Sequence, residues 1–295
     1  MTALRFDGRV AVVTGAGRGL GRAHALELAA GGASVVVNDL GTAADGTGAT
    51  VDVADQVVKE IEAAGGVAVA SHDSVADAEG AQAIVGTALE RFGRVDAVIN
   101  NAGNVITRPF AELAQPDVEA LLRVHFFGTY HMSQAAWGHM VSAGYGRIVN
   151  TVSAAMLGVP TWAGYGAAKG AVLGFTLNLA AEGAASGIRV NAIAPGAATR
   201  MVTETAGDLP QAVIERFAAG MPPSLVSPVA AYLAHESCRL NGEILATSGG
   251  RFARVTLDVT GGWGAPDLDI AAVSEHLDDA LAADTLSRWT PPLTG

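Results

Sequence analysis

A glycine-rich turn between an apolar run and a helical pattern constrains the fold of this chain more than any other feature. Residues 9–14 are apolar and rich in β-branched side chains, as in a buried parallel strand. Residues 15–21 read Gly-Ala-Gly-Arg-Gly-Leu-Gly and lead into a helical pattern. Glycine lets the backbone turn tightly against a phosphate, and a helix start offers free N–H groups to an anion. This order favours a dinucleotide site over a ligand-free turn, and the residues expected to form it are Gly15, Gly17, Arg18, Gly19, Leu20 and Gly21.

The alternation of short apolar strands with longer helical segments continues along most of the chain. Strand patterns occupy residues 9–14, 34–38, 67–71, 95–100, 146–152, 188–194 and 243–247. Such alternation gives parallel strands, right-handed crossovers and ligands at the carboxyl ends of the strands. We therefore predict an α/β fold of Rossmann type, a doubly wound, seven-stranded parallel sheet with helices on both faces. One domain is expected over residues 1–262, and an acidic extension over 263–295 is expected to pack on it or on a neighbouring subunit.

Asp39 ends the second predicted strand, about twenty residues beyond the glycine loop. A carboxylate at this point can accept hydrogen bonds from both ribose hydroxyls of an adenine nucleotide and would repel a 2′-phosphate. Arg18 favours NADP instead, because a cation in the glycine loop could bind such a phosphate. Alternatively, Arg18 contacts the pyrophosphate or solvent. We favour NAD, because the strand tip is where the 2′ position must lie.

Tyr165 and Lys169 are four residues apart, about one helical turn, so both would project from one face of a helix. A neighbouring ammonium favours the phenolate and lowers the tyrosine pKa from about 10. Tyr165 could then exchange protons near neutral pH. The pair is common by chance, so a surface tyrosine and a solvated lysine is the alternative interpretation.

Five motifs together, in their order and spacing, resemble the short-chain dehydrogenase/reductase family. They are residues 14–21, residues 100–103, Ser153, Tyr165 with Lys169, and Pro195-Gly196. The resemblance runs from about residue 5 to residue 250. Within the family the chain is similar to the (3R)-hydroxyacyl-CoA dehydrogenase domain of peroxisomal multifunctional enzymes, through residues 36–41, 72–75, 123–125, 135–140 and 235–238.

The resemblance implies an NAD(H)-dependent oxidoreductase that interconverts a secondary alcohol and a ketone. Tyr165 would exchange the proton on the substrate oxygen, and Ser153 would hydrogen-bond that oxygen. Lys169 would hold the nicotinamide ribose and lower the pKa of Tyr165. Asp73 and Ser74 would contact the adenine. The remaining cofactor contacts would come from Asn101, Ala102, Gly103, Pro195, Gly196 and Thr199.

His125 stands where most family members carry an asparagine that stabilises a helix bend and a water-linked proton path to the active-site lysine. The multifunctional-enzyme branch also has histidine here, so the resemblance implies a catalytic role for His125. The alternative is a structural histidine on the helix expected over residues 116–143. The loop between Ser153 and Tyr165 is one residue shorter than in that branch, and it borders the substrate. The resemblance implies a 3-hydroxyacyl-CoA or related acyl thioester as substrate, and a steroid or other bulky hydrophobic alcohol is the alternative.

Two segments between the expected elements bear on the site. Residues 42–51 form a Gly/Ala/Thr-rich insert, expected to be a mobile loop beside the adenosine. Residues 201–223 are interrupted by prolines and would form a substrate lid or ordinary connecting helices.

Composition limits the partners and the location. The formal charge of −11 and a pI near 5.0 argue against nucleic acid or an anionic membrane as partner. The single cysteine, Cys238, excludes an intrachain disulfide, and no metal site is expected. Without a signal-peptide pattern in residues 1–7 or an apolar run of about 20 residues, a cytoplasmic protein is expected. The family resemblance implies a homodimer or homotetramer, and a nucleotide-binding scaffold without catalysis is the alternative to an enzyme.

Overall fold

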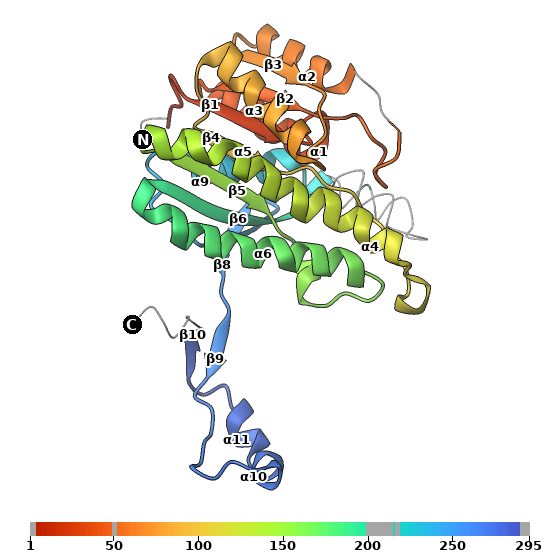
Figure 1. The fold of residues 1–295 in the computed structure, drawn as a ribbon, viewed down its shortest axis with the longest axis vertical. Helices are drawn as coiled ribbons and strands as arrows, with labels where there is room; N and C mark the ends of the chain where they lie inside the picture. The colour runs from red at the N-terminus through yellow and green to blue at the C-terminus, as the bar shows by residue number, and fades with distance from the viewer. Residues whose placement is uncertain (1–3, 49–51, 199–214, 216–218, 290–295) are drawn as a thin grey trace. The chain divides into compact units, whose positions relative to one another are not determined.

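The computed structural model describes residues 4–48, 52–198, 215 and 219–289. Its centre is an eight-stranded sheet with the strand order β3-β2-β1-β4-β5-β6-β7-β8 (Figure 1). The strands are β1 Val10–Thr14, β2 Ser34–Asn38, β3 Val67–Ser71, β4 Ala97–Asn100, β5 Gly146–Thr151, β6 Ile188–Gly196, β7 Ile244–Ser248 and β8 Arg251–Val255. The main helices of this part are α1 Gly19–Ala30, α2 Asp52–Ala63, α3 Ala78–Phe92, α4 Gln115–Leu122, α5 Gly128–Ala143, α6 Ala163–Gly183 and α9 Ser227–Ala234.

Strands β1 to β7 are paired in parallel, as predicted from the sequence. The prediction of seven strands is one strand short, because β8 adds an eighth strand beside β7. The alternation of apolar and polar residues over 251–262 predicts either an edge hairpin or an oligomer contact. Only Gly249 and Gly250 separate the two strands, with φ of 54° and 76°. A two-residue connection with positive φ at both positions makes an antiparallel hairpin, which explains the additional strand.

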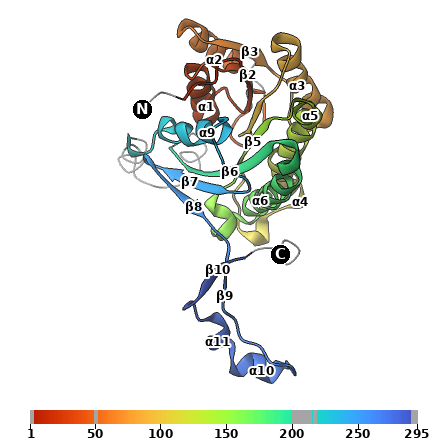
Figure 2. The same cartoon turned by 90° about the vertical axis from the view of Figure 1, so that its left-hand side faces the viewer.

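Helices cover both faces of the sheet, as predicted (Figure 2). Alternate side chains of β1 enter two separate cores. Ala11 and Val13 pack with residues of α1, α2 and α9, whereas Val10 and Val12 pack with residues of α3, α5 and α6. This period of two is the reason that a continuous apolar run identifies a strand buried on both sides.

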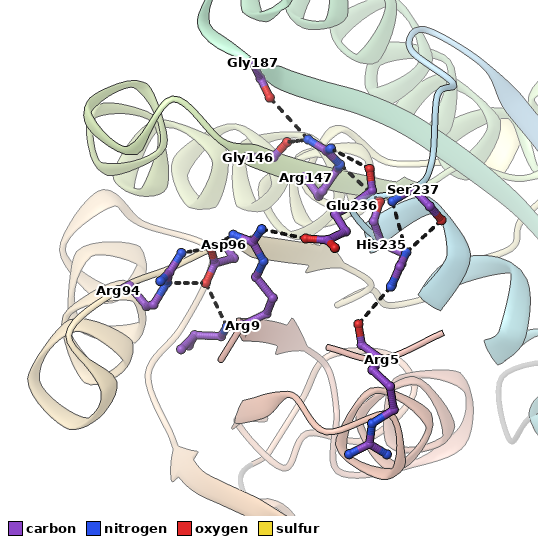
Figure 3. A network of polar contacts seen from close by, with 11 residues as sticks. Arg5, Arg9, Arg94, Asp96, Gly146, Arg147, Gly187, His235, Glu236 and Ser237 are labelled. Atoms are coloured by element: carbon purple, nitrogen blue, oxygen red, sulfur yellow. Dashed lines mark hydrogen bonds and ion pairs between the residues drawn. The ribbon is translucent and has the colours of Figure 1, made fainter. Parts of the chain in front are cut away.

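The amino ends of β1, β4 and β5 are held by a polar network (Figure 3). Its centre is Asp96, whose side chain is only 3% exposed. The carboxylate accepts from the Val10 amide at 2.9 Å, from Arg9 at 3.0 Å, and from Arg94 at 2.7 and 2.6 Å. Arg9 and Arg147 also lie over the Tyr145 ring, with their guanidinium carbons 3.9 and 4.3 Å from its centre. These groups lie at the end of the sheet away from the glycine loop, so they serve the fold.

The chain divides into two compact units, Met1–Ala253 and Arg254–Gly295, rather than after residue 262 as predicted. The boundary falls earlier because β9 (Asp258–Thr260) pairs with β10 (Leu286–Arg288) and so belongs to the second unit. Between them lie α10 (Ile270–Glu275) and α11 (Leu277–Leu281), and no residue of this unit within 254–289 is buried. None of the helices in the described ranges is long and apolar enough to cross a bilayer.

Candidate active site

The glycine loop joins the end of β1 to α1 through positions where a side chain would collide with backbone. Gly15 has a φ of 62°, and a Cβ there would lie 2.8 Å from the Cα of Ala102. A Cβ on Gly21 would lie 2.1 Å from the carbonyl oxygen of Gly15. Among the residues that the structure describes, no side chain caps the start of α1. Its first N–H groups therefore remain available to an anion, which fits the pyrophosphate of a dinucleotide.

Asp39 lies at the carboxyl end of β2 and holds two neighbouring loops. Its Oδ2 accepts a hydrogen bond from the Gly17 amide at 2.7 Å, and its Oδ1 accepts one from the Gly41 amide at 2.7 Å. Each carboxylate oxygen has a further lone pair, so both can still accept from a ribose hydroxyl. Arg18 donates to the carbonyl oxygen of Thr42 at 3.3 Å, so its side chain is directed to the segment after Asp39.

The loops after β3 and β4 complete the wall on this side. Asn101 donates from its side chain to the Thr14 carbonyl at 2.9 Å, and the amides of Asn101 and Ala102 both donate to the Thr14 hydroxyl at 3.1 Å. Asp73 accepts from the Ser71 hydroxyl at 3.1 Å through Oδ2. Thr14 therefore fixes the spacing of the β1 and β4 loops.

One cavity of about 660 Å³ brings most of the predicted site together. The predicted residues that line it are Gly15, Arg18, Gly19, Leu20, Gly21, Asp39, Asp73, Ser74, Asn101, Ala102, Gly103, His125, Ser153, Tyr165, Lys169, Pro195 and Gly196. Gly17 does not line the cavity, but its amide donates a hydrogen bond to Asp39, which does. Thr199 lies outside the described residues. So do residues 201–214 and 216–218 of the segment that was predicted to form a lid or connecting helices. Among the described residues, no group of three His, Cys, Asp or Glu side chains is placed to hold a metal ion.

The cavity is also lined by residues 42–47 of the insert, which the sequence placed beside the adenosine, and by Trp162. Lining residues for which the sequence gave no expectation include Asn104, Ala120, Arg123 and Thr151. The unusual composition of the insert was the only sequence signal for its residues. Trp162 packs the edge of its ring against Tyr165, with ring centroids 5.1 Å apart. It is thus a wall of the cavity beside the phenol.

Tyr165 and Lys169 lie one turn apart on α6, and both are buried. The Lys169 ammonium donates to the Thr151 carbonyl at 2.7 Å and lies 5.7 Å from the centre of the Tyr165 ring. Burial lowers the pKa of Lys169 to about 7. Burial also raises the pKa of Tyr165 to about 12, against the effect of a hydrogen bond with Ser153. The pKa of Tyr165 is thus raised in this structure rather than lowered as predicted, because desolvation outweighs the hydrogen bond with Ser153.

His125 lies in η2 (Arg123–Phe127), a single π-helical turn that interrupts the helix predicted over residues 116–143. Its Nε2 is 2.8 Å from the Asn104 carbonyl, which can only accept, so Nε2 carries the hydrogen and Nδ1 carries the lone pair. That Nδ1 is buried and has no hydrogen-bond partner within the described part of the chain. The ring edge contacts Tyr165 at 5.1 Å between centroids. Burial and the nearby Lys169 hold the pKa of His125 well below 6.5, so the ring is neutral.

Comparison with known proteins agrees with this geometry. Residues 9–210 match the family described as short chain dehydrogenase. A short-chain type dehydrogenase/reductase of Mycobacterium tuberculosis is 47% identical over 250 residues, covering 84% of this chain and 85% of that protein. The peroxisomal multifunctional enzyme type 2 of Mus musculus is 45% identical over 258 residues, covering 87% of this chain and 34% of the mouse protein. A crystal structure of a short chain dehydrogenase from Mycobacterium avium has a TM-score of 0.80 at 36% identity, covering 97% of each chain.

The fold, the cavity and these matches define an oxidoreductase that acts on CH–OH groups and binds a nicotinamide cofactor. The chain belongs to the short-chain dehydrogenase/reductase family. The resemblance to the peroxisomal multifunctional enzymes is confirmed, although the chain spans only 34% of the length of the mouse enzyme.

Proposed function

We propose that this chain is an NAD(H)-dependent dehydrogenase of a 3-hydroxyacyl-CoA or a related acyl thioester. The observation that carries the proposal is the single cavity in which Ser153, Tyr165 and Lys169 meet the glycine loop and Asp39. NAD is favoured over NADP because the Asp39 carboxylate occupies the end of β2 and Arg18 is directed to Thr42 instead. The substrate class rests on the similarity to the hydroxyacyl-CoA dehydrogenase branch of the family.

Tyr165 is the group assigned to the proton on the substrate oxygen. With its pKa at about 12, the phenol keeps its proton near neutral pH and is ready to act as the acid when a ketone is reduced. When NAD⁺ is bound, it supplies the hydride acceptor and a positive charge that favours the phenolate needed for alcohol oxidation. Ser153 lowers the pKa of Tyr165 through its hydrogen bond and is assigned to hold the same substrate oxygen.

Lys169 and His125 are assigned to hold Tyr165 in place and to restore its proton. The pKa of Lys169, lowered to about 7, lets this residue exchange protons near neutral pH one helical turn from the phenol. The lone pair on Nδ1 of His125 is suited to accept a hydrogen bond beside the Tyr165 ring. Lys169 is also assigned to the nicotinamide ribose, as the family resemblance implies.

The test compares initial rates of NAD reduction for a (3R)-hydroxyacyl-CoA, the same hydroxy acid without CoA, and steroid alcohols. We expect the highest kcat/KM for the CoA ester, and a lower value when NADP replaces NAD. Equal rates with and without CoA would contradict the substrate class, and faster oxidation of a steroid would replace it. Tight NAD binding without turnover of any alcohol would instead support a nucleotide-binding scaffold.

We also propose that the active form is a homodimer or homotetramer, as is common in the family. The unit Arg254–Gly295 has large apolar side chains in solvent, including Ile270 at 89% and Trp289 at 70% exposure. A unit this small that buries none of its described residues gains little stability alone, so a second copy of the chain is the expected partner. Light scattering coupled to size-exclusion chromatography should give a mass of two or four chains, and a monomer would contradict it.

A further inference from the structure

Residues 41–47 form a segment, here called the strap, that crosses the end of the sheet where the cofactor site lies. The strap leaves the end of β2 and reaches the residues that follow β4. In the sheet, β1 lies between β2 and β4, and the glycine loop follows β1. The strap must therefore pass over the carboxyl end of β1 and the glycine loop. Residues 42–47 accordingly line the same cavity as the glycine loop and Tyr165.

The near end of the strap is attached to groups that would bind the dinucleotide. The Gly41 amide donates to Asp39 at 2.7 Å, with Gly41 at a φ of 76°. The same carboxylate accepts from Gly17 of the glycine loop. Arg18 of that loop donates to the Thr42 carbonyl. The strap is thus tied to the glycine loop by hydrogen bonds of the chain itself.

The middle of the strap is a closed turn. The Ala43 amide donates to the Thr47 carbonyl at 2.7 Å, and the Gly46 amide donates to the Ala43 carbonyl at 3.0 Å. Asp45 accepts from both the amide and the hydroxyl of Thr47, at 2.9 and 2.7 Å. These bonds lie within the turn, so it can move as a unit without breaking them.

Ala44, within this turn, attaches the strap to the residues that follow β4 and is here called the far end of the strap. The Val105 amide donates to the Ala44 carbonyl at 3.0 Å. The Ala44 methyl is 9% exposed and belongs to a small apolar cluster with Val105, Leu121, Tyr165 and Ala168. Within the described part of the chain, one backbone hydrogen bond and one methyl group attach Ala44 to the residues after β4, so this is the attachment that is expected to open.

We propose that the strap is an additional wall of the dinucleotide site, which encloses a bound cofactor and opens at its Ala44 end to release it. The proposal rests on the proposed nicotinamide-dependent function. A dinucleotide held by the glycine loop and Asp39 lies under a segment attached on both sides of β1. Its dissociation rate is then set by the contacts of Ala44 and Gly46 with the residues after β4, in addition to the bonds that Asp39 makes.

The test measures the NADH dissociation rate by stopped-flow fluorescence, which needs no turnover. Ala44→Asn places an amide among apolar side chains, and Gly46→Asn places a Cβ 3.2 Å from the Asn104 side chain. Asparagine adds no charge and accepts a left-handed conformation, so the φ of 90° at residue 46 remains accessible. We expect both variants to release NADH about tenfold faster, through an unpaired amide in an apolar site at residue 44 and through crowding of the Asn104 side chain at residue 46.

Gly48→Asn is the matched control. Gly48 also has a positive φ, of 71°, but it lies outside the strap and a Cβ there has no atom within 4 Å. Its NADH release should equal that of the wild type. Wild-type rates in both Ala44→Asn and Gly46→Asn, or equal acceleration in all three variants, would overturn the proposal. Thermal unfolding of each variant without cofactor separates loss of the strap contacts from loss of the fold. If the wild type binds no NADH, the proposed function fails instead.

Discussion

His24 makes the stability of the nucleotide-binding unit sensitive to acid. It lies on α1, only 1% exposed, with Nδ1 2.9 Å from the Ser227 hydroxyl and a buried Nε2 that has no partner among the described residues. Burial lowers its pKa from 6.5 to about 4. The unfolded chain therefore binds a proton at a higher pH than the folded chain does. The stabilisation is present above pH 6.5 and is lost as the pH falls from 6.5 towards 4.

The size of this loss follows from the two pKa values. The free energy of unfolding falls by about 2 kcal/mol between pH 7 and pH 5, and by about 3 kcal/mol by pH 4, because the folded and unfolded chains bind the proton with different pKa values. His24→Leu removes the titrating group and places an apolar side chain at this buried position of α1. Urea unfolding followed by circular dichroism at both pH values, at one protein concentration, should show the wild type losing about 2 kcal/mol more than the variant. An equal loss in both proteins would refute the reasoning.

Three further substitutions test the site and the fold. Tyr165→Phe should lower kcat by about 10²–10⁴-fold while NADH affinity is kept, and near-normal turnover would remove the proton-transfer assignment. Asp39→Ser should raise the KM for NAD about tenfold and reduce the preference over NADP in steady-state assays; an unchanged preference would contradict the role of Asp39 in NAD selection. Asp96→Ala should cost about 3 kcal/mol in urea unfolding, because it leaves the Val10 amide and Arg94 without this acceptor and leaves Arg9 with Glu236 alone. Its kcat should not change, because Asp96 lies at the opposite end of the sheet, and a large fall in kcat would contradict that separation.

The positions of the parallel strands could be predicted because each strand is marked by local chemistry. Strands buried on both faces need continuous β-branched runs, and the turn after β1 needs glycine wherever Ala102 or Gly15 approaches closely. The eighth strand was not predicted as part of the sheet, although Gly249 and Gly250 mark its hairpin. Apolar and polar residues alternate along it, and this pattern fits an edge strand of the sheet and a contact with another subunit equally well.

The electrostatics of the site could not be predicted from spacing. The four-residue separation places Tyr165 and Lys169 on one face of α6, but the direction of a pKa shift depends on how completely other segments cover both groups. That covering comes from residues distant in the sequence, such as Thr151 and His125. The π-helical turn at Arg123–Phe127 was missed for a related reason, because the local pattern there is that of a regular helix.

Asp39 connects the two walls of the cofactor site, and this changes what its substitution measures. Its two oxygens accept from Gly17 in the glycine loop and from Gly41 in the strap, each at 2.7 Å. A ribose would add bonds to a carboxylate that is already fixed in position, so little rotamer entropy is lost when it binds. Removing the carboxylate therefore frees the glycine loop and the strap together, in addition to removing the ribose acceptor. For this reason the change in preference between NAD and NADP, rather than the loss of NAD affinity alone, reports the direct contact between Asp39 and the nucleotide.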